Sequence, residues 1–332
     1  MNRFKSDRSL LIGLFWVPAK YSQKVYEQIR NGGRMRIAQI YEVRDHELSP
    51  PTFFEMNEFI YPFHEIVVTY GTPNYKEINP TTFNMVTFPF LFGVMFGDIG
   101  HGLILFLFAA YLCLNKENVL KNSPSLSLLV RIRYLLLLMG FFATYAGFIY
   151  NDMMAMPLDL FGTCYTTNPL NTKEAILKEK NCVYPFGFDP KWYVAHNELS
   201  FFNSFKMKFA VIIGVMQMTL GVIMKGMNAV HHRSTIDFVF EFLPQLVFLL
   251  SLFGLMDIMI ILKWLTDWSG REGQAPSVIT QMINIALKGG EINGTPLLGS
   301  AEDQMFLTNM LMLNCLVCVP LMLYIKPWYL HR

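Results

Sequence analysis

The chain has 332 residues, of which 53% are hydrophobic and only 16% are charged, whereas a soluble domain usually carries about 25% charged residues. Its net charge of +2 gives no indication of a nucleic-acid partner. The apolar residues gather in runs of about 20, the length that spans a bilayer as a helix. These features exclude a single soluble domain and predict a mainly α-helical, multi-pass membrane protein.

Residues 1–80 predict a small α/β unit in the cytosol, followed by a helix that enters the membrane region. Leu10–Val17 predicts a buried strand and not a signal peptide, because the apolar run is only about eight residues long and lacks a small-x-small cleavage site. Lys20–Arg30 predicts a helix, Arg36–Val43 a second strand, and Asn57–Gly71 an amphipathic helix. Two strands and a helix cannot bury a stable core alone, so we expect this unit to be the end of a larger cytosolic domain.

The membrane domain is expected to cover residues 81–332. Its six predicted membrane segments lie at about 82–97, 100–114, 134–150, 207–230, 238–264 and 305–324. The first two could form one long helix. Three glycines in six residues around Asp98 favour a hairpin, because each glycine destabilises a helix by up to about 1 kcal/mol.

The basic segments predict the topology. Asn115–Arg133, His231–Arg233 and the end of the chain carry Lys, Arg and His, and cytosolic loops are enriched in such residues. With the N-terminus also in the cytosol, the hairpin places Asp98 towards the lumen, together with polar loops at about 151–206 and 266–303.

A lumenal position would permit two modifications. Cys164 and Cys182 share one loop, so a disulfide between them is possible in an oxidising compartment. Asn293 begins the sequence Asn-Gly-Thr, a possible glycosylation site.

Asp98 and His101 are the main candidates for chemistry. They are three residues apart, so they can meet on one helical turn, and a carboxylate in a membrane helix costs about 2.5–3.5 kcal/mol unless it is compensated. One hypothesis is a proton or ion relay; the other is a polar turn that pins two helices. The spacing of Gly93 and Gly97, with Gly100 and Gly102 nearby, supports close helix packing and hence the second hypothesis.

Lys208 and Asp257 are weaker candidates. Lys208 lies at the start of the fourth segment, where its side chain can reach the lumenal interface. Asp257 lies inside the fifth segment and is expected to face the bundle or a water-filled cavity, while Pro244 in the same segment is expected to be structural. No phosphate-binding loop or zinc signature is present, so we expect no metal, no cofactor and no nucleotide hydrolysis by this chain itself.

Several long motifs resemble one family. "TFPFLFGVMFGDIGHG" (Thr87–Gly102) is similar to the signature of subunit a, the large membrane subunit of the Vo sector of vacuolar-type proton-translocating ATPases. The motifs "PPTFF", "YGTPNYKEINP", "RYLLLLMGFFATYAGFIYND", "YPFGFDPKW" and "FFNSFKMK" resemble its other segments, in the family's order. The resemblance covers nearly the whole chain from about Leu10.

The resemblance implies a non-catalytic stator beside a rotating proteolipid ring, with aqueous half-channels that lead protons to and from a ring carboxylate. It implies as partners the proteolipid ring, the Vo subunits d and e, the peripheral stalk of V1 and membrane lipid, in an acidic endomembrane compartment such as the vacuole or lysosome. Asp98, His101 and Lys208 become candidates for groups near the lumenal exit. Asp257 stands where the family is usually apolar.

The sequence contains fewer predicted membrane helices than the family pattern. The family has eight membrane helices, with an essential arginine on the seventh, whereas these residues end at Arg332 after the sixth predicted segment. We therefore expect a fragment or one piece of a split subunit. Two alternatives are a stand-alone secondary transporter, although no inverted repeat is found, and a structural or assembly subunit without transport activity.

Overall fold

The computed structural model describes residues 5–7, 10–31, 41, 50–167, 175–177, 182–194, 198–268, 274–289, 292 and 294–331. Helices dominate these residues, and the strands form two small two-stranded sheets. The predicted mainly α-helical membrane bundle is confirmed.

The structure describes the N-terminal unit only in part. Its elements are an antiparallel pair, β1 (Lys5–Asp7) and β2 (Leu10–Ile12), a short 3-10 turn (Ala19–Tyr21) and helix α1 (Ser22–Asn31). The prediction of a buried strand through Val17 is wrong, because Leu14, Phe15 and Trp16 are 81%, 58% and 52% exposed. No second layer covers these side chains in the described part of the chain. The predicted strand Arg36–Val43 lies outside the described residues, apart from Tyr41.

The first group of helices comprises α2 (Tyr61–Tyr70), α3 (Thr81–Phe96), α4 (Ile99–Leu114), α5 (Lys116–Asn122), a 3-10 turn (Pro124–Leu126), α6 (Ser127–Arg131) and α7 (Arg133–Tyr150). Helices α3 and α4 are separate and both pack on α7. An 88° bend separates α4 from α5. The predicted hairpin is therefore present, closed by Gly97 and Asp98.

The second group follows a loop that contains β3 (Tyr165–Thr167), β4 (Ala175–Leu177) and a 3-10 turn (Pro190–Val194). A π-helical turn (Leu199–Asn203) leads into the long helix α8 (Ser204–His231). The next rod is built from α9 (Thr235–Asp237), a π-helical turn (Phe238–Phe242), α10 (Leu243–Leu249), a second π-helical turn (Leu250–Gly254) and α11 (Leu255–Leu265). Helices α12 (Val278–Leu287) and α13 (Ala301–His331) complete the described elements.

Four helices in the described residues are long and apolar enough to cross a membrane: Arg133–Tyr150, Phe201–His231, Thr235–Leu265 and Ala301–His331. The bent pair α4 and α5 makes a fifth candidate if it is one span, and α3 is a shorter apolar helix. Hydropathy predicted six segments, whereas the described residues contain four such helices, or five if the bent pair is one span.

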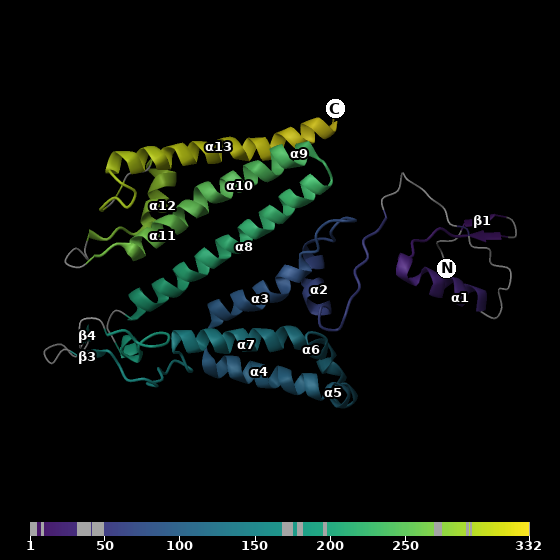
Figure 1. Ribbon diagram of the computed structural model, residues 1–332, viewed down its shortest axis with the longest axis horizontal. Coiled ribbons are helices and arrows are strands. Elements are labelled where there is room, and N and C mark those ends of the chain that lie inside the picture. The colour runs from purple at the N-terminus through teal and green to yellow at the C-terminus, as the bar shows by residue number, and fades with distance from the viewer. Residues whose placement is uncertain are drawn as a thin grey trace.

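The connections alternate between two ends of the bundle. The turn between α3 and α4, the loop with β3 and β4, and helix α12 lie at one end, while α5, α9 and the C-terminus lie at the other (Figure 1). Asp98 thus shares its end of the bundle with the loop after α7, and these two parts build the site described next.

Ion pairs tie helices together at the opposite end. Arg133, 4% exposed, and Lys116 both donate to the exposed Glu58, and these hydrogen bonds lower the pKa of the Glu58 carboxyl below its usual value. Because Glu58 lies before α2, it fixes the entry segment to α7 and α5. A second network holds α8 and α13 to the rod between them, through Lys225, Lys326, Glu241 and Asp237.

Candidate functional site: a polar cluster at the hairpin end

Asp98 caps helix α4. Its backbone is extended (φ −143°, ψ 128°), as is usual for a capping residue, and its Oδ1 accepts hydrogen bonds from the backbone N–H groups of Gly100 (2.7 Å) and His101 (3.3 Å). The Met154 N–H, from the loop after α7, donates to the same oxygen at 3.2 Å. Oδ2 lies 2.6 Å from His101 Nδ1. One carboxylate therefore closes the hairpin and attaches it to the α7 loop.

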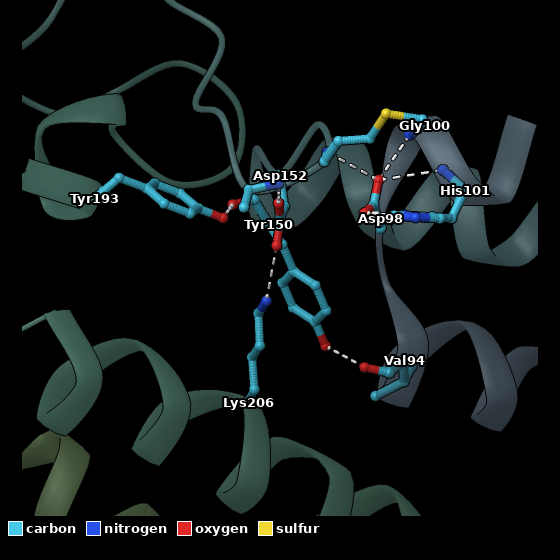
Figure 2. Close-up of polar contacts among 10 residues, drawn as sticks. Val94, Asp98, Gly100, His101, Tyr150, Asp152, Tyr193 and Lys206 are labelled. Atoms are coloured by element: carbon cyan, nitrogen blue, oxygen red, sulfur yellow. Dashed lines mark hydrogen bonds and ion pairs between the residues drawn. The ribbon is translucent and has the colours of Figure 1, made fainter.

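Asp152 forms the second half of the cluster, just after α7 (Figure 2). Its backbone carbonyl accepts from the Ile99 N–H at 2.9 Å, so the two halves are joined through the backbone. Lys206 Nζ, from α8, donates to Asp152 Oδ2 at 3.4 Å. The Lys206 ammonium also lies 4.7 Å from the centre of the Tyr150 ring and 4.1 Å from that of Phe202, distances typical of cation–π contacts.

Tyrosine hydroxyls complete the connections. The buried Tyr150 hydroxyl donates to the Val94 carbonyl of α3 at 2.8 Å, and the Tyr193 hydroxyl donates to the Tyr150 carbonyl at 3.3 Å. Figure 2 shows the Tyr150 ring between Lys206 and Val94. Helices α3, α4, α7 and α8 are thus all linked at this end of the bundle.

The loop after α7 is held in an unusual conformation. Asn151, Met154 and Ala155 all have positive φ values of 57°, 54° and 64°, a region that non-glycine residues seldom adopt. The Asn151 side chain donates to the Leu158 and Phe188 carbonyls, and the Ala155 N–H donates to Asp152 Oδ1. These bonds hold Met154 where its N–H meets Asp98.

The electrostatics keep Asp98 ionised. Burial alone would raise the pKa of Asp98, but hydrogen bonds from His101 and from the backbone of Met154, Gly100 and His101 outweigh burial and lower that pKa. Lys206 forms an ion pair with the Asp152 carboxylate. Burial raises the pKa of Tyr193, so its hydroxyl stays protonated as a donor.

The structure brings some predicted residues together and leaves others apart. Asp98 and His101 meet, as their spacing predicted. Lys208 has no hydrogen bond or ion pair with any residue in the described part of the chain, and it faces the like charge of Lys263 on α11. Asp257 also lies outside the cluster, on α11, where its buried Oδ1 has no hydrogen-bond partner among the described residues.

The four glycines of the hairpin sit at close contacts. A Cβ on Gly93 would lie 2.6 Å from the Phe142 backbone, and one on Gly102 would lie 2.6 Å from the Thr144 nitrogen. Gly97 faces the Tyr150 ring and Gly100 faces the Met154 side chain. Pro244 is buried at the start of α10, directly after a π-helical turn, which accommodates its missing N–H.

Three members of the cluster, Tyr150, Asp152 and Tyr193, were not predicted from the sequence, and the fourth, Lys206, lies two residues before the predicted Lys208. Asp152 did carry a signal, since its carboxylate comes two residues after the end of the apolar helix at Tyr150. No group of three or more metal-binding side chains is found in the described part of the chain. Asn293 lies outside the described residues.

The loop after α7 contains a disulfide between Cys164 and Cys182, whose Cα atoms are 5.7 Å apart. We expect the two cysteines to appear in one cross-linked peptide when the chain is digested without reductant. Replacing both with Ser should cost about 2–4 kcal/mol of loop stability, measured as faster proteolysis between residues 151 and 203. Finding both as free thiols in freshly prepared membranes would contradict the pairing.

The chain is similar to one family of known proteins. A family model described as the V-type ATPase 116 kDa subunit family matches residues 1–332. Over 97% of its length the chain is 35% identical to the V-type proton ATPase 116 kDa subunit a1 of Xenopus laevis, and it covers 41% of that protein. It is 37% identical over its full length to the vacuolar proton translocating ATPase 100 kDa subunit of Dictyostelium discoideum, covering 42% of it. The V-type proton ATPase subunit a3 of Arabidopsis thaliana is 35% identical over 98% of the chain, which covers 40% of that protein.

Proposed function

Because this chain belongs to the V-type ATPase 116 kDa subunit family, we propose that it serves in the membrane sector of a proton-pumping V-type ATPase, as part of the stator. The family match over all 332 residues carries this proposal. The bundle of apolar helices supports it, since a stator must remain anchored in the membrane while the ring turns. The partners would be the proteolipid ring, other Vo subunits and the V1 peripheral stalk, in the membrane of an acidic compartment and with the N-terminus in the cytosol.

The chain would not catalyse hydrolysis itself. Moving one charge against 100 mV costs about 2.3 kcal/mol, which nucleotide hydrolysis in the partner sector would supply. The helix that carries the essential arginine of the family would be provided outside these residues.

Within that role, we assign the Asp98 cluster to bracing near the lumenal exit and not to carrying the proton. A relay group must release and accept protons at the working pH, whereas the Asp98 carboxylate accepts three backbone N–H groups and contacts one imidazole. These partners lower its pKa, so it stays charged in any lumen of ordinary acidity. His101, whose side chain is 57% exposed, is the one group of the pair open to solvent.

We expect Asp98→Asn, introduced into the gene for the complete protein, to reduce assembly and ATP-driven acidification together. Acidification is measured in membrane vesicles with a pH-sensitive dye, and assembly by co-purification of the other subunits. Asp159→Asn, at an exposed carboxylate in the loop after α7, is the matched control and should behave like wild type. Full assembly with lost acidification would instead support the relay hypothesis, and normal values of both would remove Asp98 from either role.

The pH dependence follows from the lowered pKa of Asp98. A carboxylate with a depressed pKa stabilises the folded state fully above its unfolded value, about 3.9, and loses that contribution as pH falls through the folded pKa. The difference in Tm between wild type and Asp98→Asn should therefore be constant from about pH 5 to 7.5 and shrink only below about pH 4. A difference that changes near neutral pH would show that another group controls the effect.

A further inference from the structure

A pocket of about 570 Å³ lies at the end of the bundle opposite Asp98, between the loop that precedes α3, the last turns of α8 and the π-helical turn Phe238–Phe242. Its walls are mainly apolar and are formed by Ile78, Ile223, Met227, Val230, Phe238 and Phe242. Its volume and its apolar walls suit an acyl chain. It is separate from the polar cluster and lies beside the ion pairs of Lys225, Glu241 and Asp237.

The pocket is built by fixed contacts. The Ile78 N–H donates to Asn228 Oδ1 at 3.0 Å, which holds the loop on α8. Glu77 accepts from the Asn74 backbone and side chain at 2.7 and 3.0 Å, which shapes the turn that presents Lys76. Gly226 lets the Phe242 ring approach, because a Cβ there would lie 2.6 Å from that ring.

Basic side chains lie at the opening. Lys76 and His231 line the pocket, and the exposed His232 and Arg233 follow directly in the chain. The nearby carboxylates are already engaged: Glu241 pairs with Lys225 and Lys326, and Asp237 pairs with Lys326. Glu77 accepts hydrogen bonds from the neutral Asn74, so it is fixed in position but keeps its negative charge. Lys76 has no ion pair with any residue in the described part of the chain.

We propose that this pocket binds an anionic phospholipid, with an acyl chain between the apolar walls and the headgroup phosphate at Lys76 and His231. A soluble anion would leave the apolar walls uncovered, and a neutral lipid would leave the Lys76 ammonium without an anionic partner. The pocket lies at the end of the long apolar helix α8, where a membrane surface would place lipid headgroups. Basic pockets at such helix ends are suited to anionic headgroups.

The test uses the full chain in nanodiscs that contain phosphatidylserine with a photoreactive acyl chain. Cross-links mapped by mass spectrometry should fall on the pocket walls, on Met227 or Phe242. Unlabelled phosphatidylserine should compete, whereas phosphatidylcholine and soluble glycerophosphate should not. Labelling confined to other surfaces, equal competition by phosphatidylcholine, or competition by glycerophosphate would each overturn the proposal.

Lys76→Asn is the informative variant, because Lys76 has φ +67° and asparagine tolerates this region well. It removes the charge without straining the turn, and pocket labelling should fall about fivefold. Lys121→Asn, at an exposed cation on α5 outside the pocket, should leave labelling unchanged. Equal labelling of wild type and Lys76→Asn, with unchanged Tm, would overturn the role of Lys76. If labelling is lost in the assembled complex but not in the chain by itself, a protein partner and not a lipid occupies the pocket, and the proposal is overturned.

Discussion

Lys206→Met is expected to lower the stability of the membrane bundle by about 2 kcal/mol and to reduce assembly of the complex. Removing one member of a buried ion pair costs about 3–5 kcal/mol, and the effect here is smaller because the Lys206 and Asp152 side chains keep 23% and 18% exposure. Methionine preserves the apolar stem of the lysine, so the loss reports on the charge. The measurement is thermal unfolding of the full chain in detergent, together with co-purification of partner subunits.

Lys208→Met provides the matched control, two residues along the same helix. Lys208 has no ion pair with any described residue and faces the like charge of Lys263, so its replacement should be neutral or slightly stabilising. In a double-mutant cycle, Lys206→Met should cost much less stability when Asp152 is already replaced by Asn, because both substitutions remove the same ion pair. If Lys206→Met and Lys208→Met lower the stability equally, the ion pair between Lys206 and Asp152 does not account for the loss.

The choice between these lysines illustrates what the sequence could not reveal. Residues two positions apart on a helix point about 200° apart, and both lysines are flanked by apolar residues, so hydropathy does not say which faces α7. Asp152 is 54 residues from Lys206, and the loop between them follows no periodic pattern. The Asp98–His101 contact was predictable because it is local and fits one helical turn.

The membrane helices were predictable for a different reason. Long apolar runs and clustered glycines are local signals, and the predicted segment at 134–150 compares with α7 at Arg133–Tyr150. The predicted strand is present at Leu10–Ile12, but the prediction of burial was wrong at Leu14, Phe15 and Trp16, because an apolar run shows a tendency to be buried but not the presence of a second layer. Asp257 was expected to face the bundle or a water-filled cavity, and its buried Oδ1 has no hydrogen-bond partner among the described residues.

Gly102→Val is expected to destabilise the bundle by about 3 kcal/mol, at the upper end of the usual cost of overpacking. A Cβ at this position would lie 2.6 Å from the Thr144 nitrogen and 2.9 Å from the Ala143 carbonyl carbon, as well as 2.8 Å from Thr144 Oγ1, so rigid backbone would have to move. Helix α4 cannot shift alone, because Gly140 of α7 meets the Phe106 backbone equally closely. The measurement is the Tm of the full chain in detergent.

Gly214→Ala is the control that separates close packing from a general effect of replacing glycine in a membrane helix. No atom lies within 4 Å of a Cβ at Gly214, in the middle of α8. Alanine there should be neutral or should stabilise the helix by up to about 1 kcal/mol. The two substitutions should therefore change Tm in different ways, with a clear drop only for Gly102→Val. If Gly102→Val unfolds at the wild-type temperature, then α4 and α7 are not in direct backbone contact, and the bracing role proposed for Asp98 loses its support.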